Sequence, residues 1–570
     1  MSTDLILLHA PSVYDFRRKT ILYGPVSDLI PPSYVFEMYP IGFTSIAEYL
    51  ERYGYRVRIV NLAVRMLRDR KFDAETLIRR LKAAVFGIDL HWLVHCHGSI
   101  EVAKIVKKWH PEAKMVFGGF SSSYFYQELL AYPEVDYVLR GDSTEEPFRQ
   151  LMDCIMSNTE PGAVPNLAWK DNRGKMQVNP MSHVPTDLAE VMVKHYSHVV
   201  RSVIRYRDLV SYMPARNWLS YPITAILTCR GCTENCIICG GSATAFKECY
   251  NRNQPAFRSA EAVVRDVKQI SQFSNGPIFI LGDLRQPGNG YASRLLDLLG
   301  KSQVCNQFIL ELFYPAPRDL LQQMSLACPN FCLELSPESH DPEIRRISGR
   351  AYSNEELEQT LSDALDVGCA RLDVFFMIGL PRQTPSSVMD TVDYCDYLLQ
   401  KFNRDKRLCL FIAPLAPFLD PGSLAFEHPE PYGYHVLFRT LEEHRQALAA
   451  PSWKYSLNYE TKWMSRQQLV DTAYEAILRL NQVKLKHGII SPQTAELSQQ
   501  RIRAGWEMTQ KIDDILSGNS QEDIDSLKAE VDRINMFPVP EKMQLEVSPP
   551  FIKLKPLQAL WSLVTRRGEE

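Results

Sequence analysis

Four cysteines crowd into one short loop, and this feature constrains the fold more than any other part of the sequence. They are Cys229, Cys232, Cys236 and Cys239, in the run ILTCRGCTENCIICGG. The last three have the spacing C-x-x-x-C-x-x-C and come shortly after the apolar run Ile223–Leu227. Thiolate ligands select zinc, copper(I) or iron–sulfur clusters. The spacing therefore predicts a loop, at the end of a strand, whose thiolates converge on one soft metal centre.

Three other interpretations of these cysteines compete. A structural zinc site usually pairs two C-x-x-C units across a long spacer, but only three residues separate Cys232 from Cys236. A bacterial ferredoxin run reads C-x-x-C-x-x-C-x-x-x-C-P, and neither that order nor the proline is present. Cysteines without any metal would leave the clustering unexplained. We favour a three-thiolate iron–sulfur cluster, which leaves one iron open for a small molecule.

Length and composition limit the remaining possibilities. A chain of 570 residues is too long for one core, so several domains are expected. The net charge of -3 does not favour nucleic acid or an anionic membrane as a main partner. No apolar run approaches the ~20 residues that span a bilayer. Thirteen cysteines and a start without signal character, Met1-Ser-Thr-Asp, predict a reducing compartment and a cytoplasmic protein.

Residues 1–157 alternate short apolar runs with amphipathic stretches, which predicts a doubly wound parallel sheet. Ser143 and Glu146 form the pattern of a capping box at the start of a helix. The expected strands are Leu5–His9, Val57–Val60, Ala84–Ile88, Met115–Phe117 and Val135–Leu139, and the expected helices between them are Thr44–Tyr53, Ala74–Lys82 and Ile100–Trp109.

The loops after these strands are predicted to form a ligand site, because parallel sheets bind ligands beyond the carboxyl ends of their strands. Glycines in GGFSSSY and RGDSTEE let a backbone approach a large flat ligand closely. A phosphate or a nucleotide would explain these loops equally well.

Three further regions follow. Residues 158–220 are rich in proline and polar residues and read as a linker with a small hairpin at Leu167–Val178. Residues 221–430 again alternate strand and helix in six βα units, with helices expected to start at Ser259, Ser353 and Ser386. Residues 431–570 are expected to be mainly helical: Gly433–Ala449, Ser465–His487, Pro492–Leu516 and Glu522–Ile534, with an extended tail after Pro538.

The cysteine spacing after a strand resembles the radical S-adenosylmethionine (radical SAM) family. Four later segments look like the second, fourth, fifth and sixth strands of that family's partial barrel: Ile278–Asp283, Leu333–Ser339, Leu372–Thr384 and Ile412–Gly422. Ile238 stands where the family often has an aromatic residue. The resemblance implies a partial (βα)6 TIM-type barrel in which Cys232, Cys236 and Cys239 hold a [4Fe–4S] cluster. Cys229 is outside the family pattern and is expected not to be a ligand.

The resemblance also implies SAM contacts. Gly282 and Asp283 occupy the place of the strand-two motif that accepts from the SAM amino group. Glu338 and Ser339 stand where G-x-E-S often appears, and Gly379, with Pro381, looks like the G-x-P turn near adenine. A helix-start carboxylate is the alternative for Glu338, and a purely structural turn is the alternative for Gly379.

The N-terminal region resembles the cobalamin-binding domain that many radical SAM enzymes carry. YPIG (Tyr39–Gly42) looks like that domain's P-P-x-G, and RGDSTE looks like its R-G-E-x-E. The cobalamin contacts implied by this resemblance are Pro11, Pro40, Gly42, Gly118, Gly119, Gly141 and Asp142.

The histidines of DLHWLVHCHGS are a separate question. Asp89-Leu-His91 begins the D-x-H-x-x-G string of classical cobalamin proteins, but Val94 replaces the glycine and the loop follows the third strand. We expect His91, His95 and His97 to be polar loop or pocket-lining residues. A cobalt ligand and an acid–base role, since histidine titrates near neutral pH, are the alternatives.

The whole pattern resembles a cobalamin-dependent radical SAM enzyme, most plausibly a methyltransferase at an unactivated carbon. In such enzymes an adenosyl radical removes a substrate hydrogen and methylcobalamin supplies the methyl group. A reductant such as flavodoxin or ferredoxin is implied as a partner. Radical rearrangement or ring chemistry without methyl transfer, and a non-catalytic cobalamin or redox sensor, are the alternatives. The sequence does not identify the substrate.

Overall fold

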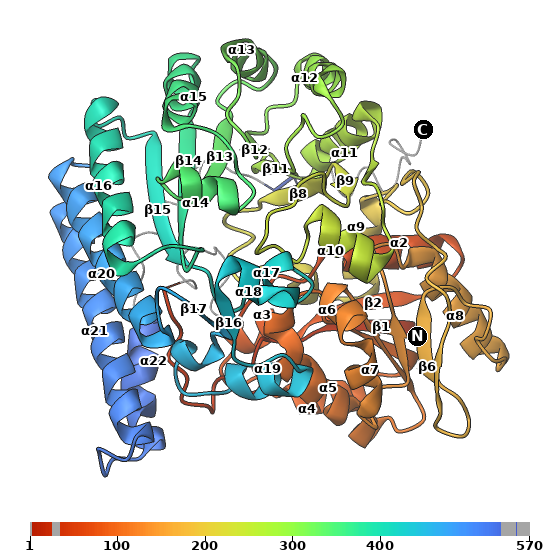
Figure 1. Ribbon diagram of the computed structural model, residues 1–570. Helices are drawn as coiled ribbons and strands as arrows, with labels where there is room; N and C mark the ends of the chain where they lie inside the picture. Colours follow the sequence, from red (N-terminus) through yellow and green to blue (C-terminus); the bar gives the residue numbers. More distant parts are fainter. Residues whose placement is uncertain (1–2, 26–34, 537–553, 556–570) are drawn as a thin grey trace.

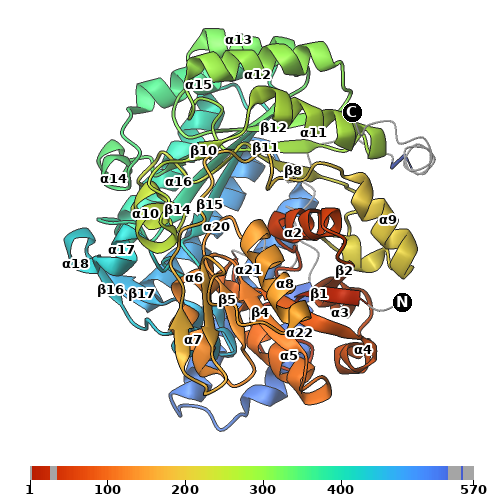
Figure 2. The same cartoon turned by 90° about the vertical axis from the view of Figure 1, so that its right-hand side faces the viewer.

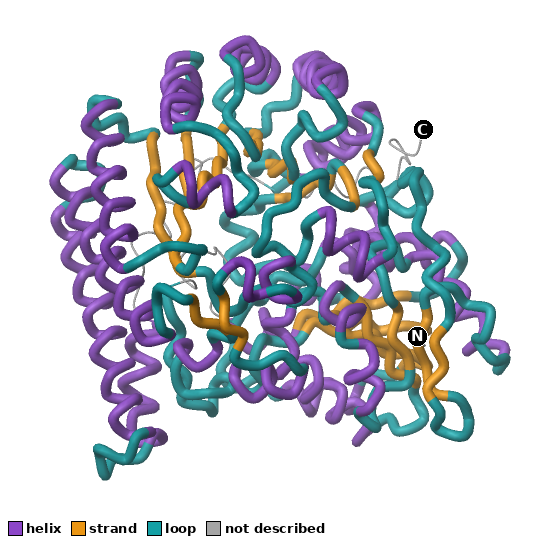
Figure 3. The backbone as a smooth tube through the Cα atoms, viewed as in Figure 1, coloured by secondary structure: helices purple, strands orange, loops and turns teal. Residues whose placement is uncertain are grey.

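Two sheets with mainly parallel strands form the framework of the protein, as seen in a computed structural model that describes residues 3–25, 35–536 and 554–555. One sheet lies in the N-terminal region and the other in the middle of the chain (Figure 1). Figure 3 shows loops and short helices in the region between the two groups of strands. This arrangement confirms the multidomain α/β fold class.

The first sheet has seven strands in the order β2-β1-β3-β4-β5-β6-β7. The first five are parallel, whereas β6 and β7 add to the edge as an antiparallel hairpin. Its strands are β1 (Thr3–His9), β2 (Val57–Asn61), β3 (Ala83–Asp89), β4 (Lys114–Gly118), β5 (Tyr137–Leu139), β6 (Leu167–Lys170) and β7 (Met176–Val178). All five expected strands and the expected hairpin are therefore present.

Helices cover both faces of this sheet, as its near-continuous apolar strands require. β1, for example, is buried along almost its whole length. Strand order reverses at β1, so the crevice beyond the ends of β1 and β3 is a topological switch point. The helices are α2 (Ile41–Arg52), α3 (Leu62–Arg68), α4 (Ala74–Arg80), α5 (Cys96–Trp109), α6 (Phe120–Tyr124), α7 (Tyr126–Ala131) and α8 (Glu145–Ser157), followed in the linker by α9 (Ser197–Tyr206).

The second sheet has six parallel strands that follow one another in chain order, as in an open half-barrel. Its strands are β8 (Thr224–Leu227), β11 (Ile278–Leu281), β12 (Phe308–Leu312), β13 (Cys332–Glu338), β14 (Arg371–Ile378) and β15 (Leu408–Pro414). Its connecting helices are α11 (Ala260–Phe273), α12 (Asn289–Ser302), α13 (Arg318–Ala327), α14 (Pro342–Ile347), α15 (Asn354–Asp366) and α16 (Pro385–Lys401).

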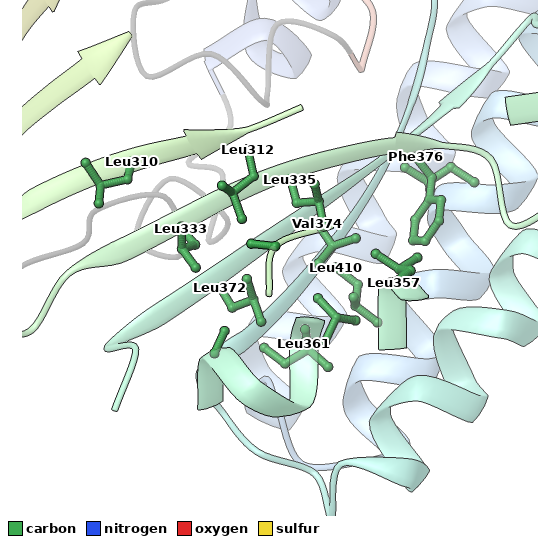
Figure 4. Packing of buried hydrophobic residues seen from close by; sticks show 14 of the residues in the cluster. Leu310, Leu312, Leu333, Leu335, Leu357, Leu361, Leu372, Val374, Phe376 and Leu410 are labelled. Atoms are coloured by element: carbon green, nitrogen blue, oxygen red, sulfur yellow. The ribbon is translucent and has the colours of Figure 1, made fainter. Parts of the chain in front are cut away.

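One face of the half-barrel packs on these helices and forms the main core. Leu310, Leu333, Leu372 and Leu410 come from four neighbouring strands and belong to the same core as Leu361 of α15 (Figure 4). Successive strand residues point to opposite faces, so the residues between these leucines line the open lumen of the barrel.

Helix starts follow the expected side-chain caps in several places. Ser259 caps α11, and Ser353 forms a capping box with Glu356. The helix expected at Ser386 begins one residue earlier, at Pro385, and is capped by Thr384. The capping box expected at Ser143 and Glu146 is wrong: α8 begins at Glu145 without a side-chain cap, because both side chains bond elsewhere.

The C-terminal region packs beside the barrel, where α20 contacts α16 and β15. Figure 2 shows this region behind the two sheets. The helix expected at Gly433–Ala449 is wrong in its first half, where β16 pairs with β17 instead. The region contains α17 (Leu424–Glu427), α18 (Pro429–Tyr432), β16 (Tyr434–Val436), α19 (Leu441–Leu448), β17 (Tyr459–Thr461), α20 (Arg466–Lys486), α21 (Pro492–Leu516) and α22 (Lys528–Met536).

Two expectations concern the ends and membranes. The extended tail expected after Pro538 lies outside the described residues, apart from Leu554 and Lys555. Within the described ranges, no helix is both long enough and apolar enough to cross a bilayer.

Candidate functional site

The cysteine loop begins where β8 ends and is fixed from two sides. Cys229 and Arg230 form the short strand β9, which pairs with β10 (Ala256–Phe257). Further on, the backbone of Ile237 bonds to Ser348 on one side and to Ala425 on the other. Ile238 is buried in the main core. The loop is therefore held by backbone contacts at both flanks, while its thiols remain free.

The three predicted cluster cysteines are free thiols with different surroundings. The Sγ of Cys232 accepts the backbone N–H of Glu234 at 3.4 Å, and the Sγ of Cys239 accepts that of Gly241 at 3.3 Å. Burial raises the pKa of Cys236 to about 11 and that of Cys239 to about 12. Since only the thiolate binds metal, a positive metal centre is needed to hold these sulfurs deprotonated.

The chemistry of the donor set is what the structure offers for testing the predicted cluster. All three cysteines lie in one loop after β8, and their thiols are free. The donor set, three cysteines of one loop with N–H···S bonds, fits a [4Fe–4S] cluster.

Glu338 is strained and incompletely bonded, next to this loop. It ends β13 with φ 69°, in the left-handed region, at a register shift in the pairing with β14. Its Oε2 is buried without a hydrogen-bond partner in the structure. Burial raises the pKa of Glu338 to about 7, against the lowering effect of Arg350. A strained residue with an unused carboxylate oxygen is typical of a ligand contact.

Arg350 supplies positive charge at the same place. Its guanidinium stacks over the ring of Phe313 at 4.9 Å and donates to the carbonyl of Phe313, while its Nε is buried without a partner. It lies close enough to Cys236 and Glu338 to lower the pKa of both. The pair Glu338–Arg350 therefore offers one unused acceptor and one unused donor beside the cluster loop.

Asp283 and Gly282 follow β11, but the Asp283 carboxylate is already occupied. Both of its oxygens bond to Arg285, and Oδ2 also accepts the backbone N–H of Phe313 at 2.8 Å. The N–H of Gly282 donates to Glu311 of β12 at 2.9 Å. Glu311 therefore lies beside the backbone of Gly282, whereas the Asp283 carboxylate is bonded within the protein.

Ser339 and Gly379 are part of turns. The Ser339 hydroxyl accepts the N–H of Asp341 at 3.1 Å. Gly379, at φ 100°, is covered by the C-terminal hairpin: a Cβ there would lie 2.2 Å from the Oη of Tyr459. Its carbonyl also accepts the hydroxyl of Tyr434 at 2.9 Å. These contacts give Gly379 a packing role that requires glycine.

A row of acidic side chains crosses the barrel lumen. Glu311, Glu334 and Asp373 are paired in register on three neighbouring strands. Burial, together with the nearby carboxylates of Asp373 and Glu311, raises the pKa of Glu334 to about 8. Asp373 is paired with Arg371 at 2.8 Å. At neutral pH, Glu334 is therefore a largely protonated hydrogen-bond donor inside the lumen.

A histidine–aspartate cluster lies at the switch point of the first sheet. The Nδ1 of His9, at the end of β1, and the Nδ1 of His91 each lie 3.0 Å from the carboxylate of Asp89, at the end of β3. Burial alone would raise the pKa of Asp89, but the two imidazoles hold it far below its ordinary value. His95 bonds to the carbonyl of Ala10, and His97 accepts the N–H of Tyr14. His91 is the most exposed of the residues in this cluster, at 30%.

The predicted cobalamin contacts lie around this same edge. Gly119, at φ 113°, permits a close approach of two loops, because a Cβ there would lie 2.4 Å from the Cα of His91. Pro11 follows β1 in the buried core, Pro40 and Gly42 begin α2, and Gly118 ends β4.

Gly141 is bonded within the N-terminal region, whereas Asp142 binds the second half of the molecule. The N–H of Gly141 donates to Ser123 at 2.9 Å. Both oxygens of the buried Asp142 accept from Arg252, which follows α10 (Ala243–Tyr250). Next to it, Glu145 pairs with Arg230 of the cysteine loop. These two ion pairs bring the carboxyl ends of both sheets toward each other.

Several of these residues were not indicated by the sequence. Arg230, Arg252 and Arg350 carry no motif, although each is an arginine close to the cysteine loop or to Glu338 in the sequence. For Glu311 the sequence did contain one indication of a special role, because it is a charged residue inside the apolar strand FILEL. An acidic residue inside a buried strand is rare unless it is paired or functional.

Comparison with protein families supports two functional regions. Residues 32–151 match the model described as the B12 binding domain, and residues 226–395 match the model of the radical SAM superfamily. The matches cover the first sheet's parallel strands after β1 and the barrel from β8 to α16.

Two curated relatives and one solved structure resemble this chain. It is 25% identical over 255 residues to cytidylyl-2-hydroxyethylphosphonate methyltransferase of Streptomyces wedmorensis, covering 39% of this chain and 47% of the relative. It is 25% identical over 276 residues to hopanoid C-3 methylase of Methylococcus capsulatus, covering 48% and 47%. The chain thus spans about half the length of these relatives.

The solved structure is the radical S-adenosylmethionine methyltransferase TsrM of Kitasatospora setae. Its fold matches with a TM-score of 0.56 over 86% of this chain and 90% of that chain, at 16% identity. At this identity the likeness shows the fold.

Proposed function

Because this chain belongs to the radical SAM enzymes that carry a cobalamin-binding domain, we propose that it is a cobalamin-dependent methyltransferase acting on an unactivated carbon. The observation that carries this proposal is the joining of the two candidate sites: Arg230 and Arg252 of the cysteine-loop region pair with Glu145 and Asp142 of the first sheet. Two cofactors that act on one substrate carbon must lie close together, and proximity is most of what a protein supplies. The names of both curated relatives support methyl transfer.

The residues divide into three groups of contacts. Cys232, Cys236 and Cys239 hold the [4Fe–4S] cluster. Glu338 and Arg350, with the backbone at Gly282, would contact SAM beside the cluster. The loops after β1, β3, β4 and β5 hold cobalamin. When bound, the cluster and SAM supply a radical that removes a substrate hydrogen, and cobalamin supplies the methyl group.

The protein's own groups bind, orient and exclude water. Glu338 and Arg350 each have an unpaired polar atom beside the loop, so a ligand with an amine or hydroxyl and a carboxylate satisfies both. The tightly packed loop flanks fix the thiols before any ligand arrives, which is the preorganisation that such a site needs. Protonated Glu334 is a hydrogen-bond donor to a substrate that enters the lumen.

The wider setting is also part of the proposal. The domains are 1–157 for cobalamin, 158–220 as linker, 221–430 as barrel and 431–570 as helical cap. A flavodoxin or ferredoxin is the proposed reductant. The proposed location is the cytoplasm, because all thirteen cysteines lie in described residues and are free.

Methyl transfer is tested with deuterium-labelled SAM. The anaerobically reconstituted protein, with cobalamin and a strong reductant, is incubated with a metabolite extract and SAM carrying a CD3 group. A product that gains one CD3 group, together with 5′-deoxyadenosine, supports the proposal. A product formed without the label would instead assign radical chemistry without methyl transfer.

A further inference from the structure

A large cavity lies at the open edge of the barrel, away from the cysteine loop. Its volume is about 570 Å³, and its walls come from α9, the linker, the start of α2, β8 and the end of α11. Cavities of roughly 300–1,000 Å³ hold small-molecule ligands. Because β8 is the first strand of an open half-barrel, its free edge allows a ligand to enter from this side.

The polar atoms of the aromatic lining are already used by the protein. A buried ring whose hydroxyl or N–H is paired presents only its apolar faces to a ligand. The Tyr39 hydroxyl donates to the carbonyl of Tyr212 at 3.0 Å, and the Tyr212 hydroxyl accepts the N–H of Ile59 at 3.3 Å. The Tyr196 hydroxyl donates to Asp266 at 3.3 Å, and the indole N–H of Trp218 donates to the carbonyl of Ile223 at 2.8 Å.

The mouth of the cavity exposes large apolar side chains. Met38 is 41% exposed, Leu209 46% and Leu219 38%, and all three line the cavity. Exposed apolar residues that gather at one concave site mark a ligand-binding surface, whereas scattered ones do not. The lining also includes Glu37, Arg216 and Lys555, but most of it is apolar, so the cavity favours a ligand with a large apolar body.

The inner wall leads into the barrel lumen. Ala225 of β8 and Phe279 of β11 are paired in register and line the cavity. Their neighbours Ile226, Ile278 and Ile280 pack into the core, so Ala225 and Phe279 lie on the lumen face. Cys229 follows Ala225 by four residues, about 13 Å along an extended strand.

We propose that this cavity binds the hydrophobic body of the substrate, and that the substrate is a large, lipid-like apolar molecule. This inference rests on the proposed function. The apolar body lies among Phe279, the tyrosine rings and Leu209, and the molecule extends along β8 so that its reacting carbon reaches the cluster end of the lumen. A small polar substrate would leave most of this apolar surface unfilled.

The test uses the neutral fluorescent probe N-phenyl-1-naphthylamine with the full-length reconstituted protein. The variant Leu209→Arg/Leu219→Arg places two charges at the mouth, where both side chains are partly exposed, so we expect the variant to fold. Leu326→Arg on α13, where Leu326 is 83% exposed and outside the cavity, is the matched control. We expect the probe to bind wild type and the control alike, and the double variant at least tenfold more weakly.

A second variant changes the inner wall of the cavity. Ala225→Phe narrows the cavity beside Phe279 and is expected to weaken binding of the probe as well. Equal affinity for wild type and both cavity variants, or no binding to wild type, would overturn the inference. Production of 5′-deoxyadenosine is measured in the same samples: its absence in all of them counts against the proposed function, whereas the probe result stands independently.

Discussion

Arg230 and Glu145 form a two-point ion pair that joins the cysteine loop to the first sheet. The Nη1 of Arg230 donates to Oε2 of Glu145 at 2.9 Å while Nη2 donates to Oε1, and the side chains are only 9% and 2% exposed. Ser45 of α2 also donates to this carboxylate at 2.7 Å. The pair fixes where the thiols lie relative to the carboxyl edge of the first sheet.

Breaking this pair from one side is expected to destabilise the protein strongly. Glu145→Gln leaves a buried guanidinium without its counter-charge, which costs about 3 kcal/mol. Urea unfolding measures the loss. Glu261→Gln, which breaks the exposed pair with Arg294, is the control and should change stability by less than about 1 kcal/mol.

A double variant separates the attraction between the two charges from the free-energy cost of burying them. Arg230→Met/Glu145→Met removes both charges, so we expect it to be more stable than either single variant. If the double variant were less stable than Glu145→Gln, the two side chains would not act as a buried pair.

Glu338→Gln tests the proposed SAM contact without changing the size of the side chain. A lost hydrogen bond to a charged group is worth about 2 kcal/mol, so we expect roughly 30-fold weaker SAM binding with the cluster absorbance unchanged. Equilibrium dialysis with labelled SAM measures the affinity. Glu355→Gln, at the exposed start of α15, should bind SAM as wild type does. Unchanged affinity of the Glu338 variant would assign that residue a structural role.

The raised pKa of Glu334 predicts that the stability of the protein depends on pH. Its pKa is raised by burial to about 8 in the folded protein, so between pH 4.5 and 8 the unfolded chain binds fewer protons and stability falls as pH rises. Glu334→Gln removes this effect. The variant should be more stable than wild type by on the order of 3 kcal/mol at pH 7 and equal to it near pH 4. A difference that is independent of pH would contradict the prediction.

Gly379, in the turn after β14, has a matched control in Gly368, which lies between α15 and β14. Both have positive φ, but a Cβ at Gly368 meets nothing within 4 Å, whereas one at Gly379 meets the buried Tyr459. Gly368→Ala should cost about 1 kcal/mol. Gly379→Ala should cost about 3 kcal/mol, because the Tyr459 hydroxyl is fixed by its bond to Leu415. Thermal unfolding of the two variants checks the difference.

Local patterns predicted the framework of the fold, because strands such as β1 and capping boxes such as the one at Ser353 depend on neighbouring residues. The capping box predicted at Ser143 does not form, because other residues take up the two side chains. Arg252, far along the chain, donates to Ser143, and Glu146 pairs with Arg149. The hairpin of β16 and β17 has strands of only three residues, which are too short to show the alternation of apolar and polar residues that predicts a strand.

The same limit applies to the site. The spacing of Cys232, Cys236 and Cys239 is a local signal and could be read directly from the sequence. The surroundings of Asp283 and Glu338 could not, since the backbone N–H of Phe313 binds the first carboxylate from the next strand and Arg350 approaches the second through the fold. Contacts between distant segments decide which carboxylate remains free.

The central claim is that the three cysteines hold a cluster that cleaves SAM beside bound cobalamin. The direct measurement is mass spectrometry for 5′-deoxyadenosine after anaerobic reconstitution with iron, sulfide and hydroxocobalamin, followed by desalting and addition of SAM and a strong reductant. The account predicts deoxyadenosine and retained cobalamin in wild type and in Cys229→Ala, and loss of deoxyadenosine in Cys232→Ala/Cys236→Ala/Cys239→Ala. Deoxyadenosine that persists in the triple variant, or cobalamin that washes off wild type, would contradict it.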